Sequence, residues 1–183
     1  MSRFDQIKEP RNHPDLEALY QEIIDNGFGK DVPVNWFTAQ SERPDILATT
    51  WGFVKGILLQ GMLPPTVKQM ISLIVSMYNN CRYCTVAHTK ALEAMGVPTE
   101  VIDSVTTDLN LAEVPPPQRA ILQFALKAAQ APESVTDDDY HALREHGLNN
   151  GEIMEVAMMA AFTNFINAWA EVSGIPVDAE ELL

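Results

Sequence analysis

Apolar residues recur at helical spacing along nearly the whole chain, and no stretch bounded by turn residues alternates apolar with polar residues. Two segments, 66–77 and 153–172, are apolar almost all the way round. Helices of that kind must be covered on every side, by the core or by another subunit. Proline-marked starts and glycine stops separate them from shorter amphipathic helices. The sequence therefore predicts an all-α protein, built as a helical bundle.

The helix boundaries follow from the capping and breaking residues. Pro14 and Pro44 each open a helix, the first ending before Gly27 and the second continuing through Leu59. The segment 32–37 between them is expected to be a connector with exposed aromatic residues. The other expected helices are 66–77, a cysteine-containing helix from 81 to about 95, a short one from 97, 118–129, a short one at 136–146, and a long one from 149 to 172.

The length and composition suit one globular unit. The chain has 183 residues, of which 46% are hydrophobic and 20% charged, so it can bury a sizeable core without disulfide staples. We expect a single domain over 1–183, with a core at about 44–110 that holds both cysteines, and C-terminal helices at 116–173.

The charge balance limits the possible partners. Acidic residues number 25 and basic residues 12, giving a formal net charge of −13, and no cluster of Lys and Arg is present. Binding to nucleic acid or to an anionic membrane surface is therefore not expected. The N-terminus lacks the apolar core of a signal peptide, and no uncharged apolar run reaches the roughly 18 residues of a membrane span. We expect a cytoplasmic protein.

The only two cysteines lie in the segment 79–88, Asn-Asn-Cys-Arg-Tyr-Cys-Thr-Val-Ala-His. If Asn80 caps the helix, Cys81 opens it, and Cys84 and His88 follow on the same face. Both sulfur atoms and the imidazole would then converge. The positive end of the helix dipole and a histidine that accepts a proton both favour the thiolate form of the cysteines. In a reducing compartment this spacing points to redox chemistry or metal binding.

Several other interpretations of the cysteine pair are weaker. A structural zinc site needs four ligands, and His13, His141 and His146 lie far away in the sequence. Attachment of a c-type haem needs a histidine directly after the second cysteine, where Thr85 stands. A thioredoxin fold would place a strand before the pair, where a long apolar helix is expected. Inert core cysteines remain an alternative. No metal and no cofactor is expected.

The segment around the cysteines resembles the alkylhydroperoxidase D-like (AhpD-like) proteins of the carboxymuconolactone decarboxylase superfamily, especially the peroxidase-related branch. The resemblance extends from about Pro44 onward. It rests on an apolar helix followed by Asn-Asn-Cys-x-Tyr-Cys-Thr-x-Ala-His and Gly-Val-Pro, and on 118–122 and 164–167 in the C-terminal part. It implies an all-helical protein that forms trimers or hexamers and reduces peroxides or disulfides in antioxidant defence.

The resemblance also implies a role for each site residue. The second cysteine, Cys84, attacks peroxide and becomes a sulfenic acid, and Cys81 resolves it into a disulfide. His88 matches the residue that helps to deprotonate the attacking thiol. The family carries a glutamate twelve residues before the first cysteine, as part of a proton relay, and this chain has Gln69 there. Because an amide does not transfer protons at neutral pH, slower turnover is expected.

The leading hypothesis is therefore a thiol-dependent oxidoreductase, a peroxidase-like enzyme whose disulfide is recycled by an external dithiol or reductase. The resemblance implies a peroxiredoxin or a lipoyl protein as the redox partner. Two other functions stay open. A cofactor-free lactone decarboxylase on the same fold would need neither sulfur, and a helical assembly protein without catalysis would have thiols that are unreactive at neutral pH.

The first prediction concerns assembly. The helix expected at 153–172 and the segment around Trp36 and Phe37 carry more apolar surface than the chain easily covers, so we expect a homo-oligomer. Light scattering at micromolar concentration measures the mass directly. A monomer under those conditions would remove the argument.

Overall fold

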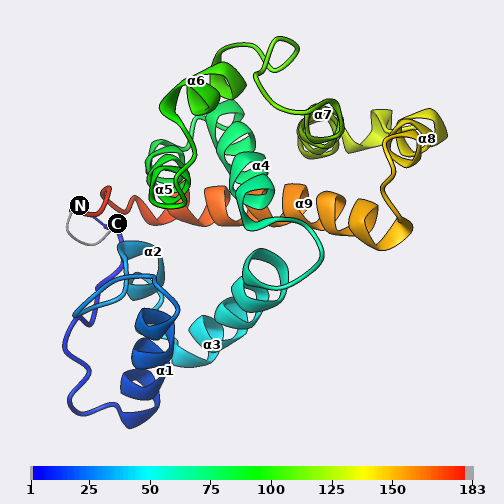
Figure 1. The fold of residues 1–183 in the computed structure, drawn as a ribbon. Coiled ribbons are helices and arrows are strands. Elements are labelled where there is room, and N and C mark those ends of the chain that lie inside the picture. The colour runs from blue at the N-terminus through cyan, green and yellow to red at the C-terminus, as the bar shows by residue number, and fades with distance from the viewer. Residues whose placement is uncertain (1, 180–183) are drawn as a thin grey trace.

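A long helix, α9 (Asn150–Ser173), crosses the molecule in the computed structural model, which describes residues 2–179 (Figure 1). No β-strand occurs within these described residues, which confirms the all-α prediction. The other elements are α1 (Pro14–Asp25), α2 (Asn35–Thr38), α3 (Pro44–Phe53), the π-helix η1 (Val54–Leu59), α4 (Pro65–Tyr78), α5 (Arg82–Ala94), α6 (Thr99–Thr107), α7 (Pro116–Gln130), the 3₁₀ turn η2 (Pro132–Ser134) and α8 (Asp137–Glu145).

The centre of the bundle is α4, the apolar helix that the sequence marks as needing cover on all sides. It packs against α5, α7 and α9, and every residue from Val67 to Ser76 is buried. In Figure 1, α4 to α8 lie on one side of α9, and α1 to α3 lie on the other. Helix α9 therefore lies between the two groups of helices. No helix in the described part of the chain is long and apolar enough to cross a membrane.

The connector expected to expose Trp36 and Phe37 is instead the short helix α2, and both side chains are buried. The Trp36 indole N–H donates to the carbonyl oxygen of Ile166 on α9 (3.1 Å). Phe37 makes edge contacts with the rings of Phe28 and Trp51. The expectation of exposed aromatic residues was wrong because the segment folds back onto α9, where an apolar ring and an indole donor both find partners.

The helix expected from Pro44 through Leu59 changes character in its middle. It is α-helical only to Phe53 and continues as η1, where the hydrogen bonds span five residues. Part of the resulting surface is apolar and uncovered. A depression between α9 and the junction of α3 with η1 has Phe53, Met158 and Phe165 as its exposed residues. Trp36 and Phe37 are buried and no longer contribute to the argument for an oligomer. The homo-oligomer remains a prediction, and it now rests only on this exposed apolar surface.

A buried ion pair fixes the loop between η1 and α4. The Lys68 ammonium group lies 2.5 Å from a carboxylate oxygen of Glu155 on α9, and it also donates to the carbonyl oxygens of Ile57 and Gln60. Burial opposes ionisation of Glu155, but hydrogen bonds from Lys68 and from two backbone N–H groups, one of them that of Met62, outweigh it and lower its pKa. This stabilisation is present at neutral pH and is lost as the pH falls through the lowered pKa.

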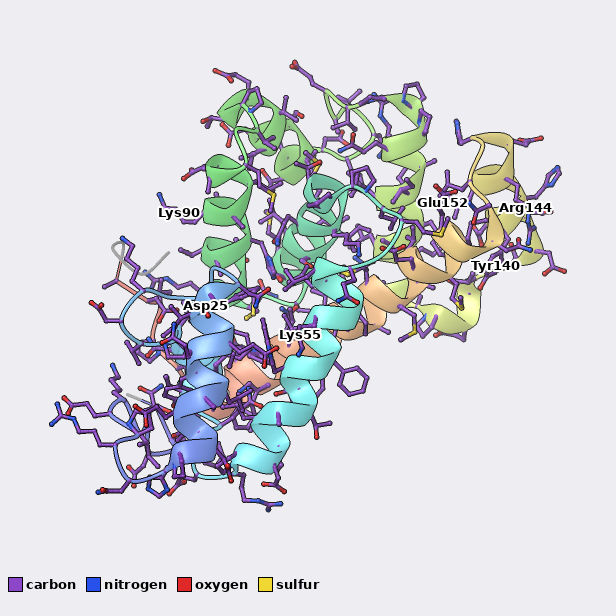
Figure 2. All side chains as sticks on the ribbon, turned by 60° about the horizontal axis from the view of Figure 1, so that its bottom comes forward. Asp25, Lys55, Lys90, Tyr140, Arg144 and Glu152 are labelled. Carbon is purple, nitrogen blue, oxygen red and sulfur yellow. The ribbon has the colours of Figure 1, made fainter. Side chains whose placement is uncertain are left out.

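The second prediction tests this pair. Glu155→Gln should lower the free energy of unfolding by about 2–3 kcal/mol, somewhat below the full effect of an orphaned buried charge, because two carbonyls still accept from Lys68. The matched control is Glu22→Gln, which breaks the exposed pair with Lys55 and should change little. Lys55 is labelled on η1 in Figure 2. Urea denaturation at pH 7 measures both. Equal midpoints for the two variants would contradict the prediction.

Candidate active site

The cysteines lie at the turn between α4 and α5. Asn79 ends α4, Asn80 has a left-handed backbone with a φ of 55°, and Cys81 is the N-cap of α5. The expectation that Asn80 caps the helix was therefore wrong by one residue. Asparagine tolerates positive φ, so Asn80 reverses the chain, and the Cys81 N–H can then donate back to the carbonyl oxygen of Ser76 (2.9 Å).

Cys81 caps α5 with its sulfur. The backbone N–H of Cys84 donates to Cys81 Sγ at 3.3 Å, and both cysteines are buried and reduced. Hydrogen bonds from the thiol and the backbone N–H of Cys84 lower the pKa of the Cys81 thiol. The same thiol contact, together with burial, raises the pKa of Cys84. The expected shift toward thiolate therefore holds for Cys81 and is wrong for Cys84 in the resting pair.

Helix α4 brings Gln69 against α5, where its side-chain oxygen lies 2.7 Å from His88 Nδ1. Since an amide oxygen only accepts, this assignment places the imidazole proton on Nδ1 and leaves Nε2 with a free lone pair. Burial lowers the pKa of His88 to about 4. The imidazole is therefore neutral at physiological pH and oriented by Gln69, so that Nε2 can accept a proton.

An apolar cavity of about 80 Å³ borders the cysteine helix. Cys84 and His88 both line it, whereas Cys81 does not and is fully buried. An adjoining cavity of about 330 Å³ shares His88 and is also bordered by Gln69 and Lys90. The walls of the first cavity are otherwise almost entirely aromatic and aliphatic: Phe28, Val34, Trp36, Phe37, Val54, Leu58, Tyr83, Ala87, Phe162 and Ile166. A molecule entering this cavity meets Cys84 and His88.

The site contains a second set of residues that the sequence analysis did not identify. The Tyr83 hydroxyl donates to Asp178 Oδ2 (2.6 Å) and accepts from the backbone N–H of Trp36 (3.2 Å). The other oxygen of Asp178 accepts from the Asn35 N–H (2.8 Å). These bonds tie the start of α5 to α2, which forms a cavity wall, and to the chain after α9. The position of Tyr83 between the cysteines was a usable signal, but nothing in the sequence marked Asp178.

Polar side chains occupy the other side of the cysteine turn. The Asn79 amide donates to the side-chain oxygens of Asn164 and Asn167 on α9, both at 2.8 Å. Glu171 follows one turn after Asn167 and borders the same groove as Asn79 and Asn167. Within residues 2–179, no group of three His, Cys, Asp or Glu side chains is arranged to hold a metal ion. The cysteine turn thus has the apolar cavity on one side, at Cys84, and the polar side chains of Asn79, Asn164 and Asn167 on the other.

The sequence profile of the Carboxymuconolactone decarboxylase family matches residues 44–131, which include the cysteine turn and α4 to α7. A search of curated proteins gave no significant match. Solved structures do match over nearly the whole chain. The AhpD core of a peroxidase-related protein from Ralstonia eutropha JMP134 is 30% identical, with a TM-score of 0.87, over 98% of this chain and 94% of its own.

Two further structures share the fold. A peroxidase-related protein from Silicibacter sp. TM1040 is 23% identical, with a TM-score of 0.85, over 98% of this chain and 93% of its own. The debrominase Bmp8 is 19% identical, with a TM-score of 0.79, over 95% of this chain and 91% of its own. The profile match, the 30% identity and the shared architecture together show that this chain belongs to the AhpD-like carboxymuconolactone decarboxylase superfamily.

Proposed function

We propose that this protein is a thiol-dependent oxidoreductase that reduces peroxides or disulfides with Cys84 and Cys81. One observation carries the proposal: a hydrogen-bonded pair of reduced cysteines stands beside a neutral histidine, and one of the two borders an apolar cavity. An inert core pair would need neither the cavity nor an oriented imidazole. The membership of the superfamily supports an activity of this class.

Cys84 is the proposed attacking residue, because it is the cysteine that a molecule in the cavity can reach. The raised pKa of Cys84 keeps its thiol protonated, so attack requires that this proton leave. His88 Nε2 is the acceptor on the cavity side. The two thiols titrate together, so the lowered pKa of Cys81 does not fix which sulfur reacts.

The proposed reaction has three balanced steps. Cys84–SH and a hydroperoxide, ROOH, give Cys84–SOH and the alcohol ROH. Cys81–SH then displaces the hydroxyl group of the sulfenic acid, forming the disulfide and one water molecule. An external dithiol reduces the disulfide and returns both thiols. A peroxiredoxin or a lipoyl protein is the proposed partner for this last step, and the homo-oligomer is the proposed working form.

A cofactor-free decarboxylase is the alternative that the family name suggests. A carboxylate substrate would need a cationic partner, and none of the residues lining the cavity at Cys84 is Lys or Arg. Removal of bromine, the activity in the name of the debrominase Bmp8, is a second candidate if it uses the cysteines, and an aromatic-lined cavity suits an apolar substrate. A Cys81→Ser/Cys84→Ser variant separates these cases. Catalytic activity that survives loss of both sulfurs favours the decarboxylase, and catalytic activity that is lost with them favours thiol chemistry.

The third prediction is that oxidation links Cys81 to Cys84 within one chain. One equivalent of peroxide should produce this disulfide with little backbone change, because the two sulfurs are already in contact. Mass spectrometry should show a loss of two hydrogens, and alkylation should then find no free thiol. The Cys81→Ser variant is the control, and it should lose peroxide reactivity after one turnover. Two thiols that persist in the parent protein would contradict the proposed function.

The fourth prediction concerns Gln69. In the parent protein, His88 should not titrate between pH 5 and 8, because burial lowers its pKa to about 4. Gln69→Glu places a carboxylate 2.7 Å from Nδ1, which should raise the pKa of His88 and make its imidazole a stronger proton acceptor. Peroxide turnover should then increase, on the order of tenfold to a hundredfold, at the low end of general acid–base effects.

The measurement is dithiol-supported peroxide turnover of both proteins from pH 5 to 8, with ¹H–¹⁵N spectra of the imidazole and with Cys84→Ser versions as blanks. A variant with intact helicity and reactive thiols that turns over no faster than the parent would show that Gln69 only orients His88.

A further inference from the structure

We propose that Asp178, acting through Tyr83 and α2, holds a narrow neck in front of Cys84 and thereby selects hydroperoxides that are unbranched at the carbon bearing the peroxide. This inference rests on the proposed function and names the substrate class of the same site. Asp178 acts in it as a positioning residue, because its side chain borders neither of the two cavities beside the cysteine helix.

The cavity of about 80 Å³ at Cys84, which we call the inner cavity, is lined mostly by buried side chains. The two wall residues that are partly exposed, Phe28 and Ala87, also border the cavity of about 330 Å³, which we call the outer cavity. The outer cavity is open to solvent, since Asn26 and Met95, which border it, are exposed. A substrate therefore reaches Cys84 through the outer cavity.

The side chains that border both cavities form the neck between them. Most of them are large and buried, and they are Phe28, Val34, Leu58, Tyr83, Ala87 and His88. The inner cavity, at about 80 Å³, has about half of the roughly 150 Å³ of an apolar cavity that holds benzene. It therefore takes a peroxide group and little more, and the organic part of a larger hydroperoxide has to lie in the outer cavity.

The carbon next to the peroxide decides which hydroperoxides fit this arrangement. The thiol takes the terminal oxygen of the hydroperoxide, and the first carbon is two bonds away from that oxygen. With the terminal oxygen at Cys84, this carbon lies at the neck. A CH₂ group needs less width there than a carbon that carries three methyl groups. One such group more or less in a hydrophobic pocket changes kcat/KM by about 10- to 200-fold.

Asp178 joins two sides of the neck. Its Oδ2 accepts from the Tyr83 hydroxyl (2.6 Å), and its Oδ1 accepts from the backbone N–H of Asn35 (2.8 Å), the residue after Val34. The Tyr83 hydroxyl in turn accepts from the backbone N–H of Trp36 (3.2 Å). Since Tyr83 and Val34 both belong to the neck, this one carboxylate fixes the start of α2 against α5.

The wall that Asp178 holds has little stability of its own. Helix α2 is four residues long, and its N-cap, Val34, makes no side-chain hydrogen bond. A helix this short is not stable by itself. A carboxylate offers an accepting oxygen to each of two donors, whereas an amide accepts through one oxygen only. Asp178 is 6% exposed, so its carboxylate depends on these hydrogen bonds, and the position of the wall depends on the carboxylate.

The fifth prediction compares two isomers, 1-butyl hydroperoxide and tert-butyl hydroperoxide, which differ only in branching. The parent protein should have the higher kcat/KM for the 1-butyl isomer, by more than the rate ratio that free dithiothreitol shows with the same pair. Tyr83→Phe keeps the ring and removes the hydroxyl, so it should reduce this preference on the order of tenfold. Asp178→Ala should do the same, and Asp178→Asn should lie between it and the parent because one accepting oxygen remains.

The controls separate a specific effect from a general one. In an Asp178→Ala background, Tyr83→Phe should cause no further change, because both substitutions break the same hydrogen bond. Asp103→Asn on α6 and Tyr140→Phe on α8 remove the same groups at residues that border neither cavity, and they should leave the preference unchanged. General loosening would lower both kcat/KM values together and keep their ratio. A parent without the preference, or an unchanged ratio in folded Tyr83→Phe, overturns the proposal.

A readout without peroxide separates this inference from the proposed function. In a Cys81→Ser background, modification of Cys84 by methyl methanethiosulfonate is compared with modification by the tert-butyl analogue, and Tyr83→Phe should shift the rate ratio toward the tert-butyl reagent. If the parent consumes no hydroperoxide but this ratio shifts, the proposed function and the choice of hydroperoxide fail, while control of access to Cys84 stands. If the parent turns over normally and neither ratio shifts, the proposed function stands and the role of Asp178 is lost.

Discussion

The tight reversal between α4 and α5 is the constraint on which the site depends. One residue with a left-handed backbone, Asn80, turns the chain so that Cys81 caps α5 with its sulfur and receives the N–H of Cys84. The same reversal packs the two helices side by side and sets Gln69 against His88. The thiol pair and the imidazole are thus positioned by one local conformation, supported by the buried centre of α4.

The two sides of the cysteine pair differ in chemistry. At Cys84 the surroundings are apolar, with a neutral His88 and aromatic walls that α2 and the Tyr83–Asp178 bond keep in place. On the other side of the cysteine turn they are polar, because Asn79 binds Asn164 and Asn167 of α9. An uncharged oxidant suits the apolar cavity at Cys84. Exchange of protons with water suits the polar groove beside Asn79.

The sequence was sufficient for the fold class, which follows from helical periodicity, and the resemblance to the family singled out Gln69 and His88, which the structure places 2.7 Å apart. It was insufficient where contacts join distant segments. The burial of Trp36 and Phe37 depends on α9, more than a hundred residues later, and Asp178 carries no local pattern that distinguishes it from surface acids. The cap was displaced by one residue because Asn and Cys can both serve at this turn, and only the backbone of Asn80 decides.

The central claim is that Cys84 is oxidised from the apolar cavity while Cys81 resolves it. The most direct measurement is trapping of sulfenic acid with dimedone in the two single variants, followed by peptide mapping after one equivalent of a hydroperoxide. The account predicts a stable adduct on Cys84 in the Cys81→Ser protein and little or none on Cys81 in the Cys84→Ser protein. An adduct that forms on Cys81 alone, or on neither residue, would contradict it.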